Sequence, residues 1–311
     1  LMLLSSYFAV ASQEIEYKLL ADFDVKNSEY SGFDVSESSF YVIDKKKTLR
    51  VFSIETLKEL YKISDKIERA FYSPNGEWLV IPMKKEIKLL NINSGKIDSI
   101  SYKRKVKFLG WKANSKSFAI ADDRFGVRII DAKTAREKVV VSVHKRKKFF
   151  FSRLVDTAQF SAIEAHFIPN TDKVLTTCDD KTGELWDSET GDLLKTFQHF
   201  DPYYPYKSRE IIGGEVSSDG KWIVTKTYDD TYLWRAEDGK LVKGFVGYNF
   251  LQFSPNNKYL GLINDPNGYR AVRIMNLETE TIKTFFDEYQ GGIGRWSNDS
   301  KSFMTNRTID E

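Results

Sequence analysis

Short apolar runs alternate with polar turns along the whole chain, and the alternation repeats. The segment FYSPNGEWLVIP (71–82) shows an apolar residue, a turn of Ser, Pro, Asn and Gly, and then a strand-like apolar run. Related segments begin at an apolar residue at positions 33, 72, 111, 167, 216, 253 and 296, with intervals of 39, 39, 56, 49, 37 and 43 residues. A period of roughly forty residues indicates an array in which each repeat is one supersecondary unit.

A second pattern follows the first in each unit. In GELWDSETG (183–191) and TYLWRAEDG (231–239), apolar and polar residues alternate over four or five positions before a polar turn, which is typical of a half-buried strand. Another short apolar run then follows, as in DLLKTF (192–197) and KLVKGF (240–245). Each unit therefore offers four strands.

These repeats resemble those of the WD-repeat β-propellers, in degenerate form and of the bacterial type. Only Trp186-Asp187 is a true Trp-Asp pair. No Gly-His pair is present, and Asp180 fits the family's structural Asp, which most units lack. The resemblance implies an all-β fold with a single domain over residues 1–311, a seven-bladed β-propeller of four-stranded antiparallel blades that depend mainly on apolar packing. The equivalents of the Trp-Asp pair are Phe52-Ser53, Leu90-Asn91, Ile130-Asp131, Trp234-Arg235 and Met275-Asn276.

The two ends of the chain allow two interpretations. The last unit contains only two strands before Glu311, and residues 6–20 match the pattern of residues 231–245, so N- and C-terminal strands together could complete the seventh blade. Alternatively, residues 1–11 are apolar and end in Ala-Val-Ala, like the end of a signal peptide. Export to the periplasm and a cytoplasmic location therefore both remain open.

Charge is distributed unevenly along the chain. The formal net charge is only +3, but residues 101–150 hold 15 Lys and Arg against 4 Asp and Glu, so the remainder is net acidic. In a propeller, the loops between the second and third strands emerge on the same face as the loops between blades. This scheme predicts one basic face lined by aromatic residues from two long insertions. The candidate binding residues are Lys45, Lys46, Lys47, Lys84, Lys85, Lys103, Arg104, Lys105, Lys145, Arg146, Lys147, Lys148, Phe150, Tyr203, Tyr204 and Tyr206.

Motifs for catalysis are absent from the sequence. It contains no Gly-x-Ser-x-Gly, P-loop or His-Glu-x-x-His pattern, and SSDGKW (217–222) falls one residue short of a sialidase Asp-box. The only cysteine, Cys178, excludes an internal disulfide and lies in a predicted buried strand. Asp122-Asp123, Asp179-Asp180 and Asp229-Asp230 fit tight turns better than a calcium site. We therefore predict no catalytic residue, cofactor or metal.

These patterns favour a non-catalytic scaffold that presents the basic face to an acidic protein segment. The other half of that face carries Asp229, Asp230, Asp287 and Glu288, and a surface of both signs suits a protein partner. The alternatives are direct binding of a polyanion such as nucleic acid, phospholipid headgroups or an anionic glycan, and an enzyme acting at the central channel. Lysine runs that merely solvate loops are the simplest explanation of the charge. No apolar run is long enough to span a membrane as a helix.

Overall fold

A computed structural model describes the chain from residue 28 to residue 304, with gaps. The described ranges are 28–33, 38–122, 126–141, 145–150, 153–159, 162–178, 183–197, 211–227, 230–264, 270–287 and 295–304. Residues 1–27, which carry both interpretations of the N-terminus, lie outside the described residues, as do Asp180 and the final residues after 304.

Six antiparallel four-stranded sheets follow one another along the chain. The first sheet contains β1 (Ser28–Phe33), β2 (Ser39–Asp44), β3 (Leu49–Ser53) and β4 (Glu59–Ile63). The second contains β5 (Phe71–Tyr72), β6 (Trp78–Pro82), β7 (Glu86–Asn91) and β8 (Ile97–Ser101). The third contains β9 (Val106–Trp111), β10 (Ser117–Asp122), β11 (Gly126–Asp131) and β12 (Arg136–Val141). The fourth sheet contains β15 (Ala162–Phe167), β16 (Lys173–Cys178), β17 (Gly183–Asp187) and β18 (Leu193–Phe197). The fifth contains β19 (Gly213–Val216), β20 (Trp222–Lys226), β21 (Thr231–Arg235) and β22 (Leu241–Phe245). The sixth contains β23 (Asn249–Phe253), β24 (Tyr259–Asn264), β25 (Arg270–Asn276) and β26 (Ile282–Asp287). We number these sheets as blades 1 to 6.

Two further sheets have two strands each. One is the hairpin of β13 (Lys145–Phe150) and β14 (Arg153–Gln159), inserted between blades 3 and 4. The other is the pair β27 (Arg295–Trp296) and β28 (Phe303–Met304), which follows blade 6. The predicted four-strand repeat is therefore confirmed in six units, and the last unit contributes two strands among its described residues.

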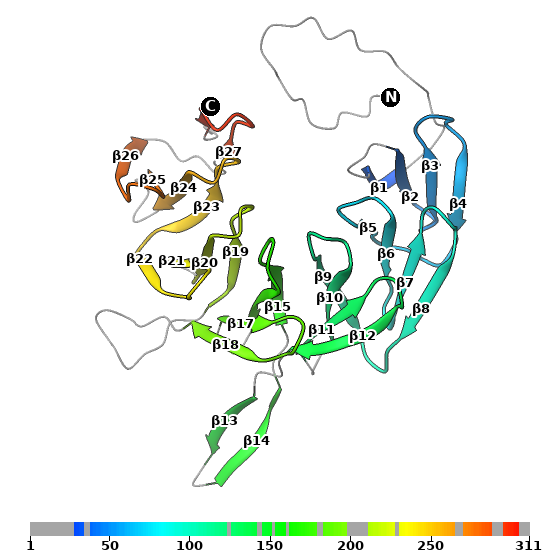
Figure 1. Ribbon diagram of the computed structural model, residues 1–311, viewed down its shortest axis with the longest axis horizontal. Coiled ribbons are helices and arrows are strands. Elements are labelled where there is room, and N and C mark those ends of the chain that lie inside the picture. Colours follow the sequence, from blue (N-terminus) through cyan, green and yellow to red (C-terminus); the bar gives the residue numbers. More distant parts are fainter. Residues whose placement is uncertain are drawn as a thin grey trace, which may run out of the picture.

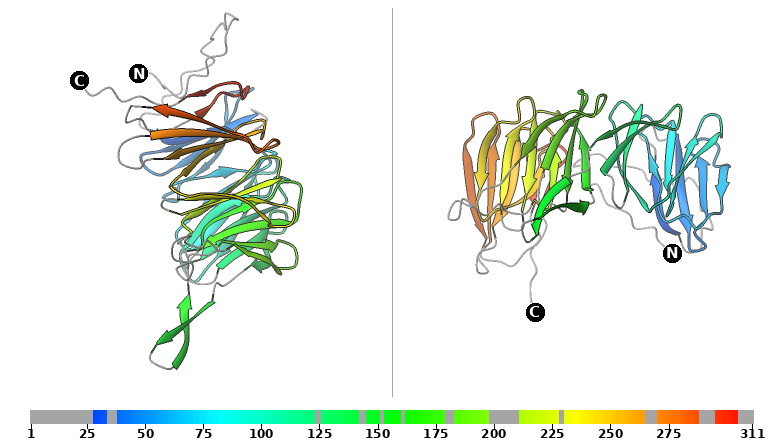
Figure 2. Two further views of the ribbon diagram at one scale, coloured as in Figure 1. Left: turned by 90° about the vertical axis from the view of Figure 1, so that its left-hand side faces the viewer. Right: turned by 90° about the horizontal axis from the view of Figure 1, so that it is seen from below.

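The blades form an arc around a central space, with β1 and β27 at its two ends (Figure 1). In each blade the first strand lies on the inner side of the arc and the fourth on the outer side (Figure 1). Figure 2 shows the arc edge-on, with turns emerging on two opposite faces. Within the described ranges no strand joins β1 to the β27–β28 pair, so closure of a seven-bladed ring stays a prediction.

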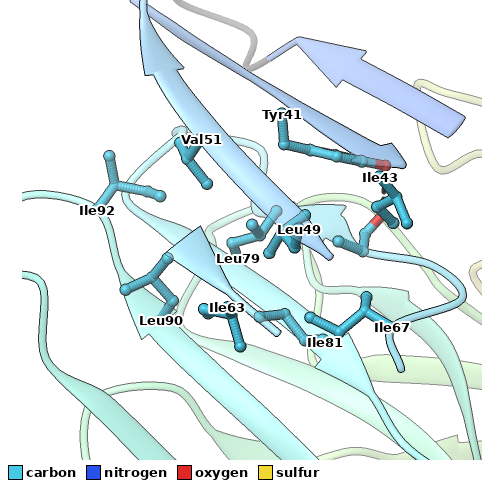
Figure 3. Close-up of a cluster of buried hydrophobic side chains, with 11 residues drawn as sticks. Tyr41, Ile43, Leu49, Val51, Ile63, Ile67, Leu79, Ile81, Leu90 and Ile92 are labelled. Carbon is cyan, nitrogen blue, oxygen red and sulfur yellow. Dashed lines mark hydrogen bonds between the residues drawn. The ribbon is translucent and has the colours of Figure 1, made fainter. Parts of the chain in front are cut away.

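Apolar packing between neighbouring blades builds the core. The middle strands are covered on both sides, so β6 and β20 are buried at three consecutive residues. Outer strands such as β8 and β18 keep mostly exposed residues. Between blades 1 and 2, one cluster is largely aliphatic, and each fully buried Leu or Ile contributes about 1.5–3 kcal/mol (Figure 3). The expected reliance on apolar packing is borne out in these interfaces.

The turn between the first two strands of several blades is held by a Ser and a short acceptor. Ser73 Oγ donates to Asn75 Oδ1 at 2.7 Å and accepts a hydrogen bond from the Trp78 amide at 3.0 Å. Ser217 makes the same contacts with Asp219 and Trp222, so the segment resembling an Asp-box is an ordinary propeller turn.

In five of the six blades, the second position of the Trp-Asp pair or its equivalent holds the turn between the third and fourth strands; in blade 5 this position is Arg235. Asp187 Oδ1 accepts hydrogen bonds from the amides of Glu189 and Thr190, at 2.8 and 2.9 Å. Asn91 Oδ1 accepts from Ser94, and Asp131 Oδ1 accepts from Thr134, both at 2.8 Å. A short side-chain oxygen is what the turn needs, and this explains why Asp, Asn and Ser replace one another in the degenerate repeats.

Replacing Asp187 by Ala should therefore lower the free energy of unfolding by about 1 kcal/mol, because two turn amides lose their acceptor. Asp187→Asn keeps the acceptor and should cost much less. Hydrogen bonds from the backbone lower the pKa of Asp187, so its charge-dependent contribution is present above the ordinary Asp pKa and is lost as the pH falls. Urea unfolding of the three proteins at neutral and acidic pH measures this, and equal losses for Ala and Asn would refute it.

Candidate interaction surface

In blade 1 and again in blade 2, backbone hydrogen bonds join the basic turn between the second and third strands to the loop that leaves the same blade. The amide of Ile67, in the loop that leaves blade 1, donates to the Lys47 carbonyl at 2.8 Å. In blade 2, the amide of Tyr102 donates to the Lys85 carbonyl at 2.8 Å, and the amide of Val106 donates to the Lys84 carbonyl at 3.2 Å. The turn between the second and third strands thus lies against the loop that leads to the next blade.

The turn after β2 leaves two of its three lysines, Lys45 and Lys46, exposed to solvent. The Thr48 amide donates to Asp44 Oδ1 at 3.0 Å, and the Lys47 amide donates to the Asp44 carbonyl at 2.8 Å. Lys47 has a φ of 62°, and Lys45 and Lys46 are exposed. Because Asp44 and the backbone hold the turn, the exposed side chains of Lys45 and Lys46 are not needed to form it.

The structure adds three residues that the sequence analysis missed. Lys66 and Arg69 are exposed in the loop between blades 1 and 2, beside the Lys47 carbonyl contact. The guanidinium carbon of Arg69 lies 5.8 Å from the ring centroid of Tyr30, whose side chain is also exposed. Applying the same loop scheme to residues 64–70 would have predicted both cations, although these residues form no visible basic run.

We define the basic surface as the cations of these loops: Lys45, Lys46, Lys47, Lys66, Arg69, Lys84, Lys85, Lys103, Arg104 and Lys105. All are exposed except Lys47 and Arg104, which are half-buried. Four acidic residues lie in or beside the same loops, and one of them, Asp65, pairs with Lys88 on β7. Cations therefore predominate on this part of the face, and Tyr30 provides an aromatic ring beside them.

The sequence predicts a loop for the insertion that carries Lys145, Arg146, Lys147 and Lys148. The structure shows a β-hairpin instead. Lys145–Phe150 forms β13, which pairs only with β14 in the described structure. Phe149 and Phe150 are strand-forming residues, and their register partners are Leu154 and Arg153. Residues 145–150 therefore lie outside the four-stranded sheet of blade 4.

The other residues predicted for this face are the three tyrosines of the second insertion and the acidic residues, among them Asp230. Tyr203, Tyr204 and Tyr206 lie outside the described residues, so their place on the face stays a prediction. Asp230, expected to add negative charge, is fully buried, and its Oδ1 accepts a hydrogen bond from the Gly247 amide at 2.8 Å. Its side chain accepts a backbone hydrogen bond, as predicted, but this bond comes from another loop and not from its own turn, and its predicted contribution to an exposed acidic half is wrong.

A group of ionisable residues lies where blades 4 and 5 meet. Glu164 Oε2 accepts a hydrogen bond from the Gly214 amide at 3.0 Å and lies 3.6 Å from His166 Nε2. Burial would raise the pKa of Glu164, but contacts with His166 and the Gly214 amide and the charge of Lys226 lower it; burial raises the pKa of Glu215. The bond to Gly214 assigns Glu164 to holding two blades together.

Within the described ranges, no three His, Cys, Asp or Glu side chains are placed to hold a metal ion. The backbone of Cys178 ends β16, as its predicted position in a strand requires. Over the same part of the chain, no helix is long and apolar enough to cross a membrane.

Comparison with known proteins supports the fold. No family model and no curated protein matches the sequence. Among solved structures, the chain is similar to the crystal structure of the Myceliophteria thermophila Cps50 (Swd1) beta-propeller domain, with a TM-score of 0.53 and 15% identity over 88% of this chain and 90% of that chain. At this identity the likeness shows the fold and not a shared partner. The chain thus has a β-propeller fold.

Proposed function

We propose that this protein is a non-catalytic interaction scaffold whose basic surface binds an acidic segment of a partner protein. The observation that carries the proposal is the set of backbone hydrogen bonds that, in each of blades 1 and 2, hold the basic turn after the second strand against the loop that leaves the same blade. These bonds fix the loops without using the lysine side chains. Exposed charge on rigid loops attracts an oppositely charged partner and favours its correct orientation.

The proposal extends to the other predicted residues of the face. Lys145–Lys148, Phe150 and the three tyrosines Tyr203, Tyr204 and Tyr206 would enlarge the same binding region. We also propose that the ring is a seven-bladed, bacterial-type WD-like propeller that residues 6–20 complete beside β27 and β28. This closure would remove the free edge of the two-stranded sheet.

The test is a titration of a labelled acidic peptide by fluorescence anisotropy, with single-stranded RNA and anionic vesicles as competing ligands. Lys84→Ala with Lys85→Ala removes two exposed charges, and their backbone carbonyls continue to accept the hydrogen bonds that organise the loop. At about 0.5–1 kcal/mol for each charge, we expect the peptide to bind roughly tenfold more weakly.

The matched control is Lys221→Ala with Lys240→Ala, which removes the same charge from exposed turns of blade 5 on the opposite face. It should bind like the wild type. RNA or vesicle binding that is tighter than peptide binding and falls steeply with salt would favour the polyanion alternative instead. Equal binding by both double variants, or no binding at all, would mean that the lysines only solvate the loops.

A further inference from the structure

The hairpin β13–β14 is an addition to the propeller repeat. It accounts for most of the excess length in the interval from residue 111 to residue 167. It is a separate two-stranded sheet, and Figures 1 and 2 show it projecting away from the arc of blades. No described strand pairs with its outer edges. An isolated two-stranded hairpin is marginally stable in water, so a third strand would stabilise it.

The two edges of this hairpin differ in regularity. Arg146 pairs with Ala158, and Lys148 pairs with Val155, so Asp156 and Thr157 on β14 lie opposite Lys147 alone. This is a β-bulge with the extra residue on β14. A bulge bends its strand and interrupts the regular row of amides and carbonyls, and for this reason it protects an edge from pairing. The regular edge of the hairpin is therefore that of β13.

The regular edge is also the basic one. β13 has the sequence KRKKFF, and no acidic residue occurs within it. Lysine on an edge strand discourages pairing with a second copy of itself, because like charges would lie opposite each other. The same lysines favour an acidic strand, since opposite charges on neighbouring strands contribute about 0.2–1 kcal/mol for each pair.

From the register, the bulge and the charge we infer that β13 takes up an extended acidic segment of a partner protein as an added strand. The main-chain hydrogen bonds of the new ladder provide affinity, and the basic residues select an acidic sequence. Every second residue of β13 directs its amide and carbonyl away from β14, which supplies the donors and acceptors for that ladder. This inference rests on the proposed function and specifies how the acidic segment is held.

The experiment compares two forms of one labelled peptide in which Glu and Thr alternate. Both forms carry the same number of N-methyl groups and the same charge. In the first, every methyl group lies on alternate residues, so one edge of the extended peptide keeps all its amides. In the second, the methyl groups are divided between both edges, so neither edge is intact. Strand addition predicts that the full-length protein binds the first form at least about tenfold more tightly, a difference of about 1.4 kcal/mol.

Two variants show which part of the protein causes the difference in affinity between the two peptides. Replacing residues 145–159 by a short Gly-Ser linker should abolish the difference between the two peptides, and thermal unfolding checks that the blades remain folded. Lys84→Ala with Lys85→Ala should weaken both peptides and preserve the difference. Peptides that bind equally to the wild type would overturn strand addition while leaving the proposed function intact. Failure of even the unmethylated peptide to bind would overturn both.

Discussion

Replacing Trp234 by Ala should lower the free energy of unfolding by about 3–5 kcal/mol. The side chain is only 6% exposed, and its ring centroid lies 4.9 Å from that of Phe197 in the preceding blade. Its indole Nε1 donates a hydrogen bond to Thr225 Oγ1 at 2.7 Å within its own blade. The substitution therefore leaves a large cavity between blades 4 and 5 and removes a buried hydrogen bond.

Trp234→Phe separates these two effects. Phe keeps an aromatic ring beside Phe197 but has no donor for Thr225, so we expect a loss of about 1–2 kcal/mol. Trp186→Phe is the matched control, because Trp186 Nε1 donates to Thr176 Oγ1 at 3.0 Å from a half-buried position, and it should cost less. Urea unfolding followed by fluorescence and by circular dichroism gives the values. A loss for Trp234→Ala no larger than that for Trp186→Phe would disprove the assignment.

The partner of each tryptophan explains why the repeats are degenerate. Trp186 lies opposite Val174 and bonds Thr176, two residues further along the neighbouring strand, and Trp234 has the same relation to Ile223 and Thr225. In the other blades the first position of the pair is Phe52, Leu90, Ile130 or Met275, and the residues at the place of the threonine are Val42, Ile81, Ile120 and Leu262, respectively. A polar pair has thus been replaced by an apolar pair at both of its positions, and the blade keeps its packing.

This pairing shows how far the sequence could predict the fold. The strands could be predicted because apolar and polar residues alternate along them and polar turns separate them. The contacts that hold these turns join residues close in the sequence, as Ser73 with Asn75 and Asp187 with Thr190 show. Turns held by such local contacts can therefore be predicted from a short segment of the sequence. The hairpin β13–β14 was missed because an edge strand without a blade has no apolar alternation to reveal it.

Only part of the candidate site could be predicted, because some of its residues form runs in the sequence and others are placed by contacts between distant segments. Lysine runs such as Lys84-Lys85 are visible in the sequence, and the topology then places them on one face. Arg69 is a single cation outside any basic run; the loop scheme would place it on this face, but its position 5.8 Å from the ring of Tyr30 is not visible in the sequence. The burial of Asp230 depends on the Gly247 amide in a different loop. Contacts between distant segments decide these cases, and no pattern within one segment records them.

A second large effect is expected at Lys112, which connects blades 3 and 4 on the face opposite the basic surface. Lys112 is 6% exposed, and its Nζ donates to Asp172 Oδ1 at 2.6 Å and to Glu189 Oε1 at 3.1 Å. Removing one partner of a fully buried ion pair costs about 3–5 kcal/mol, because the other charge is left without compensation. Asp172 is largely exposed and can be hydrated, so Lys112→Ala should cost about 2–3 kcal/mol.

Lys112→Met tests how much of this loss is electrostatic, because Met retains most of the buried aliphatic stem. Burial would lower the pKa of Lys112, but the hydrogen bonds to Asp172 and Glu189 outweigh it and raise that pKa. The stabilisation is therefore fully present below the ordinary Lys pKa and is lost as the pH rises through the raised value. For Glu189, the hydrogen bond from Lys138 and the contact with Lys112 outweigh burial and lower the pKa, so its stabilisation is lost as the pH falls.

The difference in unfolding free energy between the wild type and Lys112→Met should consequently be largest between about pH 5 and about pH 10, and should shrink on both sides. Urea midpoints across this range measure it, with Lys116→Met, an exposed lysine of the same turn, as the control that should show no such profile. A difference that stays constant with pH would mean that Lys112 acts only through its aliphatic stem. A profile that falls at both extremes would mean that charge on Lys112 holds the two blades together, independently of the loops that form the basic surface.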